Sequence, residues 1–349
     1  MQLAVLLRKF TMKHANISLF VPHAGCPNQC SFCNQKTISG SVSELTAEEV
    51  RKTLEDAEKS GLVPENTEIA FFGGSFTAID RGYMISLLEE AKPFIENGIF
   101  SGIRISTRPD AIDEEVLLLL KKYGVTAIEL GAQSMNDDVL LQNRRGHTVS
   151  DVINASLLIK KYGFSLGLQM MTGLYKSTRE ADIETAKSII ALKPDTVRIY
   201  PTIVLENTHL SELLKQKKYV SPTLDETVSL CAELLEMFYE NNIKVIRLGL
   251  HSGGNVLDGY LSGPYHPAFG ELCESEIYLK IIRKKLFEIY KNEKISETKN
   301  VTIFVNNKEI SKATGQKGKN KELLLSDGFS VTIKGSETLE KYQILIEEN

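Results

Sequence analysis

Short apolar runs rich in β-branched residues alternate with longer segments of helical period over residues 16–252. Such alternation produces parallel strands that are joined by right-handed crossovers and buried on both faces. The sequence therefore predicts an α/β fold, and six or seven βα units fit a partial barrel better than an open doubly wound sheet. The predicted strands are 17–21, 68–72, 102–107, 127–131, 165–171, 196–200 and 244–248, and the predicted helices are 47–59, 83–94, 114–123, 149–162, 178–192 and 223–241.

The alternation stops near residue 250, where Gly and Pro at 251–255 and 263–267 predict loops before a helix from about 271 to 290. The pattern of the last fifty residues predicts a strand, a helix, a glycine-containing loop, a second helix and two further strands, in that order. We therefore divide the chain into a barrel core at 1–252, a loop and helical extension at 253–298 and a small α+β module at 299–349. The predicted module elements are 301–305, 308–313, 319–325, 330–333 and 342–346.

The composition is that of an ordinary globular chain, with 349 residues, 42% hydrophobic and 25% charged. It excludes collagen, disorder and a disulfide scaffold. No apolar run approaches the roughly 20 residues of a membrane helix, and the apolar start lacks the flanks of a signal peptide. We interpret the residues before Met12 as an extension without function. Five cysteines, three of them clustered, indicate metal binding in a reducing compartment such as the cytoplasm.

The net charge of −4 is unevenly distributed. The segment from Lys280 to Lys321 holds twelve Lys or Arg and four Glu, a charge of +8, so the rest of the chain carries −12. A basic segment on an acidic body is typical of a polyanion-binding appendage, although a solvated lysine-rich helix is the commoner cause of such a run.

Three cysteines, Cys26, Cys30 and Cys33, follow the first predicted strand with the spacing C-x3-C-x2-C. Three thiolates on one short loop can ligate three irons of a 4Fe–4S cluster and leave the fourth iron open to a non-protein ligand. Zinc is the alternative metal, but a closed zinc site needs a fourth ligand. The nearest candidate, His23, would crowd the loop.

This motif, with the aromatic Phe32 before its last cysteine, resembles the radical S-adenosylmethionine (SAM) superfamily. The resemblance implies a partial (β/α)6-type radical SAM barrel followed by the helical extension and the α+β module. It implies a 4Fe–4S cluster that gives one electron to bound SAM, which cleaves to methionine and a 5′-deoxyadenosyl radical. Phe32 would then line the adenine site.

A second match follows the next predicted strand, at Gly73, Gly74 and Ser75. In the superfamily this position binds the methionine amino group, often through Gly-Gly-Glu, and here Ser75 replaces the acid. Glycines at a strand end admit a ligand close to the backbone. The resemblance therefore implies cofactor contacts at all three positions.

Further stretches at 106–110, 129–134, 143–148 and 198–202 resemble the radical domain of the catalytic subunit of Elongator, a tRNA wobble-uridine modifier. The resemblance runs to about residue 227, and it extends more distantly to oxygen-independent coproporphyrinogen oxidase. A chain of this length cannot also hold the acetyltransferase domain of the Elongator subunit, which moreover spaces its cluster cysteines differently. The similarity therefore supports the cofactor chemistry better than the substrate.

Residue by residue, this broader resemblance implies cofactor contacts on several predicted strand ends. Gln133, Arg145 and Gln169 fall where the methionine carboxylate and the ribose hydroxyls are bound. Ser106 stands where the porphyrinogen enzyme has a glutamate. Arg108 and Arg145 follow strands on the catalytic face, where a guanidinium suits a carboxylate, although surface ion pairing is the simpler interpretation.

The C-terminal module resembles a minimal KH-type RNA-binding fold in its element order and its GxxG turn. In KH domains this turn lies against the nucleotide backbone. GxxG alone is a weak signal, and the +8 segment strengthens it. The residues implied as RNA contacts are Gly315, Gln316, Lys317, Gly318 and Lys319.

A few other residues could bear chemistry. His251, His266 and Glu271 are placed near the predicted barrel mouth, where a structural histidine is commoner than a substrate ligand. Cys231 falls on the apolar face of a helix and is expected in the core. Cys273 could donate hydrogen or act as a resolving thiol. Of Met170 and Met171, adjacent on a strand, at most one faces the interior.

The sequence supports three hypotheses. The first is a radical SAM enzyme that modifies tRNA or rRNA and receives electrons from a donor such as flavodoxin or ferredoxin. The second keeps the chemistry but assigns a small-molecule or protein substrate, with the module as an interaction domain. The third is a non-catalytic iron–sulfur or zinc regulator that binds RNA, which the full set of cofactor-binding motifs disfavours.

Overall fold

The computed structural model describes residues 15–21, 30–33, 44–61, 63–250, 259–291 and 297–348. Its main element is a seven-stranded sheet with the order β1-β2-β3-β4-β5-β6-β8, in which every neighbouring pair is parallel. The predicted α/β fold is therefore confirmed. The strands are β1 (Ala15–Val21), β2 (Thr67–Gly73), β3 (Ile103–Thr107), β4 (Val125–Gln133), β5 (Ser165–Thr172), β6 (Thr196–Pro201) and β8 (Lys244–Leu248).

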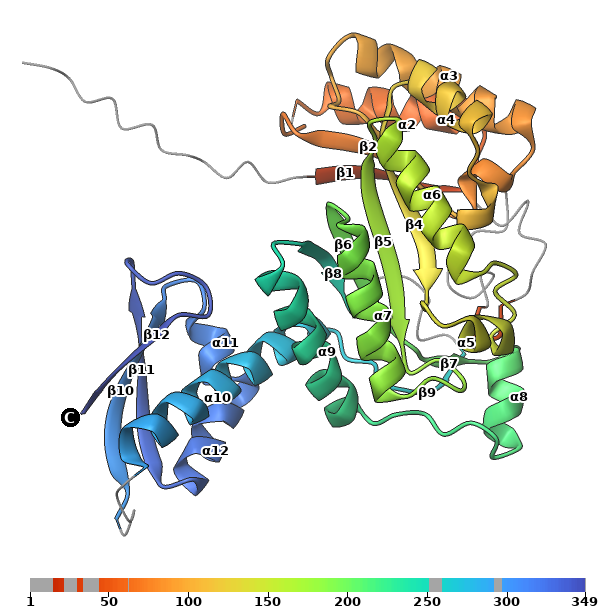
Figure 1. The fold of residues 1–349 in the computed structure, drawn as a ribbon. Coiled ribbons are helices and arrows are strands. Elements are labelled where there is room, and N and C mark those ends of the chain that lie inside the picture. Colours follow the sequence, from red (N-terminus) through yellow and green to blue (C-terminus); the bar gives the residue numbers. More distant parts are fainter. Residues whose placement is uncertain are drawn as a thin grey trace, which may run out of the picture.

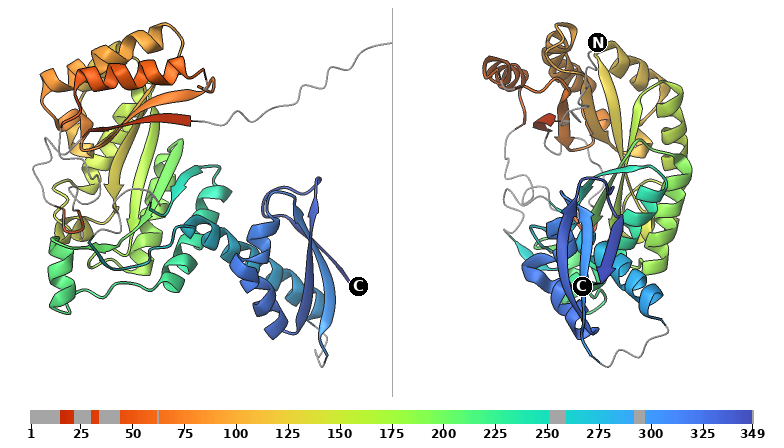
Figure 2. Two further views of the ribbon diagram at one scale, coloured as in Figure 1. Left: turned by 180° about the vertical axis from the view of Figure 1, so that it is seen from behind. Right: turned by 90° about the vertical axis from the view of Figure 1, so that its left-hand side faces the viewer.

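Helices cover the outer face of this sheet, which curls into an incomplete barrel (Figures 1 and 2). Within the described residues no pairing joins the edge strands β1 and β8, so the barrel stays open on one side. The side chain of an Asp or Thr caps the first turn of each of these helices. Such residues mark helix starts in a sequence, and the predicted starts lie close to the observed ones. The helices are α2 (Ala47–Lys59), α3 (Arg81–Glu96), α4 (Glu114–Lys122), α6 (Val149–Lys161), α7 (Arg179–Leu192) and α9 (Leu224–Glu240).

Alternating strand residues build the two faces of the sheet. Ile69 and Phe71 of β2 are fully buried in the core against the helices, whereas Phe72 faces the concave side and lines a cavity there. On β5, Met170 lies in that core and Met171 lines the cavity, as the strand period predicts. The concave side is thus left for function.

Several short elements were not predicted, because segments of two to seven residues carry too little periodicity. One of them, β9, lies in the extension after the first predicted loop and pairs antiparallel with β7. They are η1 (Phe76–Ala78), η2 (Pro109–Ala111), α5 (Asp137–Gln142), β7 (Val204–Leu205), α8 (His209–Lys215) and β9 (Tyr260–Ser262).

The long helix α10 (Phe269–Tyr290) belongs to two cores. Its first half contributes Phe269, Cys273 and Ile277 to the barrel core, and its second half contributes Tyr278 and Ile282 to the core of the C-terminal module. One continuous helix therefore fixes the module to the barrel, as Figure 2 shows. Among the described residues, no helix is both long and apolar enough to cross a bilayer.

The module has the element order that the sequence predicts. Its strands form a sheet of order β11-β10-β12, with β10 parallel to β11 and antiparallel to β12. Glu274 of α10 holds it through Lys312 and Lys341, and the Asn320 amide donates to the Ser275 carbonyl at 2.9 Å. Its elements are β10 (Lys299–Asn306), α11 (Ile310–Thr314), η4 (Gln316–Gly318), α12 (Lys319–Ser326), β11 (Phe329–Ser336) and β12 (Ile344–Glu348).

Candidate active site

A cavity of about 810 Å³ occupies the concave side of the barrel. Its size is in the range that holds a cofactor or a drug-sized ligand. Apolar side chains of β1, β2 and β5 form part of its wall, and Arg198, Tyr200 and Arg247 add polar groups. Six of the residues that the sequence implicates in cofactor binding line this cavity, namely Phe32, Cys33, Gly73, Ser106, Gln133 and Gln169.

The described part of the cysteine loop, residues 30–33, lies at the cavity. Cys26 lies outside the described residues, Cys30 is buried, and Cys33 is half-buried and lines the cavity. Ser31 is held from both sides, because its amide and hydroxyl donate to Asn143 at 3.0 and 2.6 Å and its carbonyl accepts from Leu210 at 2.7 Å. Asn143 and α8 thus fix a loop whose cysteines would hold a cluster.

Arg145 lies beneath this loop. Its Nη1 donates to the Cys30 sulfur at 3.1 Å, and its Nη2 donates to the Gly131 carbonyl at 2.8 Å. The side chain is 9% exposed and absent from the cavity wall. The structure therefore brings Arg145 to a cysteine sulfur, whereas the family resemblance implied a cofactor carboxylate.

Gly73 ends β2 with φ +112°, a conformation that glycine alone adopts readily. A Cβ there would lie 2.5 Å from the Phe20 ring and 2.6 Å from the Val21 carbonyl oxygen. That carbonyl also accepts the Gly74 amide at 2.8 Å. Both glycines therefore hold β2 tightly against β1 at the rim of the cavity.

Ser75 and Arg108 lie apart from the cavity. The Ser75 hydroxyl is buried, accepts the Arg108 amide at 3.0 Å and shares a hydrogen bond with Thr107 at 3.1 Å. The Arg108 guanidinium pairs with Asp110 through two hydrogen bonds of 2.8 and 2.5 Å. In this arrangement Ser75 ties the end of β2 to β3, and Arg108 pairs with Asp110.

A tight turn presents Gln133 to the cavity. Gln133 has φ +65°, and the Ser134 amide donates across it to the Ala132 carbonyl at 2.8 Å, which is a γ-turn of the rare positive-φ form. His147 lies 3.2 Å from the same carbonyl through Nε2. Burial and the Arg145 charge lower the pKa of His147 to about 4, so the neutral ring donates this bond.

A buried ladder of charges crosses the floor of the barrel. Arg104 lies between Glu68 at 2.8 Å and Glu129 at 3.4 Å, and Glu129 accepts from Arg198 at 2.8 Å. Glu129 also accepts from Gln169 at 2.9 Å, which orients that amide at the cavity wall. The ladder is not among the predicted features, although charged residues in the middle of otherwise apolar parallel strands are its signal.

The cavity fits a polar cofactor that brings hydrogen-bond donors. Among the described residues, Gln133 Oε1 is buried without a hydrogen-bond partner, although its side chain lines the cavity. An unpaired buried acceptor is costly unless a ligand supplies a donor. The hydroxyl and ammonium groups of SAM are such donors, and the neighbouring cysteines are suitable cluster ligands.

The other residues singled out from the sequence lie elsewhere. His266 Nδ1 accepts the Ala268 amide at 3.0 Å beside the start of α10, which is a structural role, and His251 lies outside the described residues. Cys231 and Cys273 are both fully buried between α9 and α10, and burial raises the pKa of Cys273. Glu271 lines a separate pocket of about 360 Å³ beneath the GxxG turn.

The GxxG turn itself is accessible at the edge of the module. Gln316, Lys317 and Lys319 are exposed, and Gly315 and Gly318 have φ of +78° and +84°. A Cβ on Gly315 would lie 2.7 Å from the Asn320 amide nitrogen, so glycine is required there. Lys319 lies 3.5 Å from Asp225 at the start of α9, which places the turn beside the barrel.

Comparison with known proteins finds family matches over the part of the chain that forms the barrel and the start of α10. The family model of the radical SAM superfamily matches residues 20–189, and the Radical_SAM C-terminal domain model matches residues 194–279. A tRNA uridine(34) acetyltransferase of Methanocaldococcus jannaschii is 32% identical over 202 residues, 52% of this chain and 37% of that protein. Human Elongator complex protein 3 is 32% identical over 209 residues, 54% of this chain and 38% of that protein. The chain thus spans well under half the length of these curated relatives.

Two further comparisons concern more of the chain. An uncharacterised protein of Methanocaldococcus jannaschii is 30% identical over 244 residues, 66% of this chain and 73% of that protein. The solved structure of archaeal Elp3 from Methanocaldococcus infernus superposes with a TM-score of 0.61 at 23% identity, covering 78% of this chain and 63% of that one, which shows a shared fold. With the two family matches, these findings show that the chain belongs to the radical SAM superfamily of enzymes.

Proposed function

We propose that this enzyme cleaves SAM reductively at a 4Fe–4S cluster and uses the resulting radical to modify RNA, with tRNA as the first candidate. The observation that carries the proposal is the contact between Arg145 and Cys30 at the edge of the cavity lined by Cys33 and Gln133. The buried guanidinium places a positive charge and a hydrogen-bond donor against a sulfur that would be a ligand of the cluster.

When bound, the cluster and SAM supply a 5′-deoxyadenosyl radical that removes a hydrogen atom from the substrate. The protein supplies binding, orientation and exclusion of water. Cys26, Cys30 and Cys33 would hold the cluster. Around the cofactor, Phe32 offers an aromatic wall, Gly73 a close backbone approach, and Gln133, Ser106 and Gln169 hydrogen-bonding groups.

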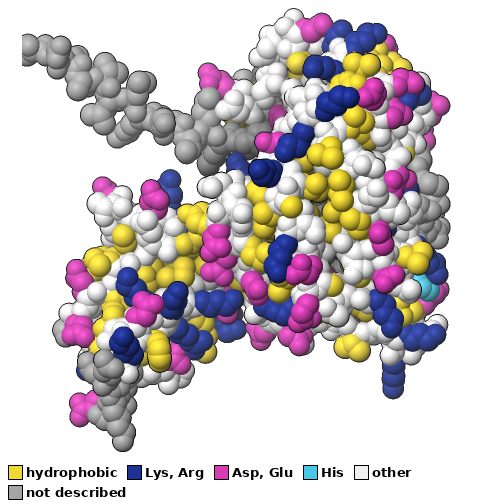
Figure 3. Space-filling view, in the orientation of Figure 1, with side chains coloured by type: hydrophobic (Ala, Val, Ile, Leu, Met, Phe, Trp, Pro, Cys, Tyr) yellow, Lys and Arg dark blue, Asp and Glu magenta, His cyan; other side chains and the backbone are white. Residues whose placement is uncertain are grey.

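The RNA substrate is supported by two independent observations. Curated relatives carry names that describe modification of tRNA uridine 34. The C-terminal module has the strand–helix–GxxG–helix–strand order of a KH-type fold, and it exposes Gln316, Lys317 and Lys319 around the turn. Figure 3 shows Lys and Arg side chains over the helices of this module. Asp and Glu side chains lie among them, and the exposed lysines at the turn are the groups that would contact a phosphate backbone.

The chemistry also requires a one-electron donor. Flavodoxin or ferredoxin is the class of partner that we propose, and the reducing cytoplasm is the compartment that suits both the cluster and an RNA substrate.

The test is anaerobic reconstitution with iron and sulfide, followed by incubation with SAM, a strong reductant and bulk tRNA. We expect about four irons per chain and absorbance near 400 nm. 5′-Deoxyadenosine should form, and tRNA nucleosides should show a mass change by mass spectrometry. A variant with Cys26, Cys30 and Cys33 replaced by Ala is the control, and it should lose all of these signals.

Two results would contradict the proposal. Stoichiometric iron in the triple cysteine variant, or a preference of the wild type for zinc, would show that the cluster assignment is wrong. Formation of 5′-deoxyadenosine without any change in RNA, but with a change in a small molecule or protein, would instead refute the RNA substrate alone.

A further inference from the structure

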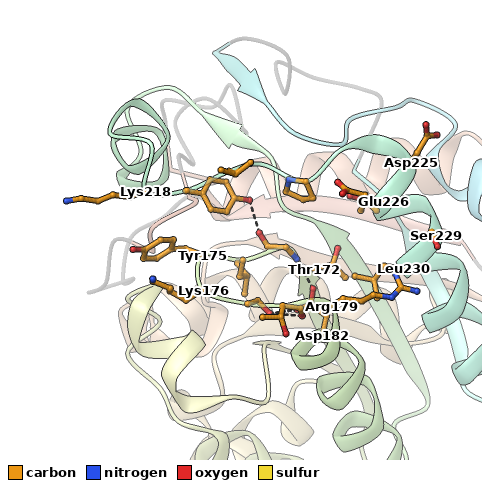
Figure 4. Close-up of a pocket in the computed structure, with 18 residues that line it drawn as sticks. Thr172, Tyr175, Lys176, Arg179, Asp182, Lys218, Asp225, Glu226, Ser229 and Leu230 are labelled. Carbon is orange, nitrogen blue, oxygen red and sulfur yellow. Dashed lines mark hydrogen bonds between the residues drawn. The ribbon is translucent and has the colours of Figure 1, made fainter.

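A second pocket, of about 730 Å³, lies on the outer side of the barrel at the end of β5. Met171 and Thr172 are consecutive residues of β5, and Met171 lines the inner cavity whereas Thr172 lines this outer pocket. Figure 4 shows the outer pocket between the loop after β5, the segment before α9 and the first turn of α9. In α/β proteins ligands bind at this end of the strands.

Two tyrosines stand at one wall of the outer pocket. The rings of Tyr175 and Tyr219 lie edge to face with their centroids 6.3 Å apart. The Tyr219 hydroxyl donates to the Gly173 carbonyl at 2.7 Å, which fixes that ring (Figure 4). Tyr175 is half-buried, and Lys176 lies over its ring at 5.5 Å. Rigid aromatic rings beside lysines are what single-stranded nucleic acids bind.

The acidic groups of the outer pocket already have partners. Asp182 accepts from the Gly173 amide at 2.9 Å and from the Ser177 hydroxyl at 2.5 Å. Glu226 accepts from Thr223 in the helix cap, and Asp225 pairs with Lys319.

The positive groups differ in this respect. Arg179 of the outer pocket pairs with Glu233 at 2.5 Å. Lys176 and Lys218 are exposed, and in the part of the chain that the structure describes neither lies within 4.0 Å of a carboxylate. Lys176 and Lys218 are therefore the groups of the outer pocket that are free to contact an anionic ligand.

The outer pocket also lies between the GxxG turn, which the proposed function assigns to RNA binding, and the cysteine loop, which it assigns to the cluster. On one side, Asp225 of its wall contacts Lys319, directly after the GxxG turn. On the other side, the Asn143 amide donates to the Tyr175 carbonyl at 2.9 Å, and the same Asn143 anchors Ser31 of the cysteine loop. An RNA strand that ran from the module to the mouth of the barrel would pass over this pocket.

We propose that the outer pocket binds one nucleotide of the RNA substrate, with the base against Tyr175 and the adjoining phosphates at Lys176 and Lys218. This inference rests on the proposed function and extends it by assigning a substrate site outside the reaction cavity. The ring wall, the two lysines without a carboxylate partner and the pocket volume all match a nucleotide, and the contacts with Lys319 and Asn143 place it on the path to the chemistry.

The test measures binding of bulk tRNA to the reconstituted enzyme at several salt concentrations. Replacing Lys176 and Lys218 with Glu should weaken binding roughly tenfold at 0.15 M salt and flatten the logarithmic salt dependence by about 0.7 for each lost contact. The matched control is Lys187→Glu with Lys244→Glu, two exposed lysines that do not line the outer pocket. The control should bind like the wild type.

The aromatic wall has its own test. Tyr175→Ala should weaken binding about five- to 150-fold, as loss of one stacked base does, whereas Tyr175→Phe keeps the ring and should bind like the wild type. Transcribed tRNA that contains 4-thiouridine should crosslink on irradiation to a peptide that includes Tyr175 or Tyr219. Iron content and the thermal unfolding midpoint of each variant serve as checks on folding.

Failure of this inference can be separated from failure of the proposed function. If the wild type binds and modifies tRNA, but the lysine and Tyr175 variants match it in affinity and salt slope, the outer pocket is not a nucleotide site. If the wild type neither binds nor modifies tRNA, the proposed RNA substrate and this pocket assignment are both overturned.

Discussion

The guanidinium of Arg145 donates to the sulfur of Cys30 at 3.1 Å, although the two residues lie 115 positions apart in the chain. Its other amino group donates to the Gly131 carbonyl at 2.8 Å, so one buried side chain joins the cysteine loop to the end of β4. A positive charge at this position favours the more negative, reduced state of any cluster bound there.

We therefore predict that Arg145→Gln makes the reconstituted cluster harder to reduce. Loss of a charge-assisted hydrogen bond to a cluster thiolate should lower the reduction potential by an amount on the order of tens of millivolts. The measurement is a spectroscopic redox titration of the cluster. Binding of SAM should weaken as well, because Arg145 supports Gly131 beside Gln133.

The neighbouring arginine provides the control. Arg144 is exposed, so Arg144→Gln removes the same charge but leaves the hydrogen bond between Arg145 and Cys30 in place. An equal change of potential in both variants would mean that only net charge matters. An unchanged potential in Arg145→Gln would show that its contact with Cys30 does not persist in the loaded enzyme.

The pH dependence of folding follows from His147. Its pKa falls to about 4 in the fold, mainly because of burial and secondly because of Arg145, compared with 6.5 for the free side chain. Above pH 6.5 the ring is neutral in both states, so its contribution does not vary. As the pH falls from about 6.5 to about 4, the unfolded chain takes up a proton that the folded chain refuses. Stability should therefore decrease by up to about 3 kcal/mol over this window.

Chemical denaturation of the metal-free protein at pH 4.5, 5.5 and 7 measures this effect. His147→Gln keeps a side-chain donor for the Ala132 carbonyl but does not titrate, so it should lose this part of the pH dependence. It should also retain SAM affinity better than His147→Ala, because the turn at Gln133 keeps its second donor. Identical pH profiles for the wild type and His147→Gln would refute the assignment of a buried neutral ring.

The sequence predicts the barrel strands well because their apolar faces pack on helices that begin at strong caps. Lys244–Leu248 is predicted to the residue, and so is α2, which begins after Thr46, where this residue forms a capping box with Glu49. The helices of the module lack side-chain caps, and its element order is predicted instead from its apolar strands and the glycines of the GxxG turn. These are local patterns, and tertiary packing reinforces them rather than overriding them.

The site is only partly predictable because its key contacts join distant positions. The motifs select Cys33, Gly73 and Gln133, which the structure places around one cavity. Nothing local distinguishes Arg145, which reaches a sulfur, from Arg108, which pairs with an aspartate two residues away. The partner that each arginine binds depends on which loop its side chain meets after folding.

The charge ladder under the cavity yields a prediction of stability. Glu129 is 1% exposed and holds both Arg104 and Arg198. Removing it by Glu129→Ala leaves two buried guanidinium groups short of a partner, which should cost about 3–5 kcal/mol. Urea unfolding of the metal-free protein measures the loss.

Glu184→Ala is the matched control for that experiment. Glu184 pairs with Lys187 at 2.6 Å on the exposed surface of α7, where an ion pair contributes about 0–1 kcal/mol. If Glu129→Ala costs no more than Glu184→Ala, water or local rearrangement compensates the two arginines, and the ladder is not a determinant of stability.

The GxxG turn of the module gives the last prediction, which is independent of the outer pocket. Replacing Gln316 and Lys317 with Asp places two carboxylates on the exposed turn while Gly315 and Gly318 keep its shape. Lys317 has φ +53°, a conformation that Asp tolerates better than most residues, so the variant should fold. If the turn lies against an RNA backbone, the double variant should lose most of its affinity for bulk tRNA through like-charge repulsion.

A matched pair of substitutions isolates the position of these charges. Asn300→Asp with Lys334→Asp makes the same change of charge, amide to carboxylate and lysine to carboxylate, on exposed strand residues of the same module, so net charge is equal. Filter binding of labelled tRNA compares the two double variants, and both should keep about four irons and the SAM cleavage seen without RNA. Equal losses of affinity in the two double variants would show that only the change in net charge matters. Wild-type affinity in the Gln316 and Lys317 variant would instead show that the turn does not face RNA, because two carboxylates against a phosphate backbone cannot leave binding unchanged.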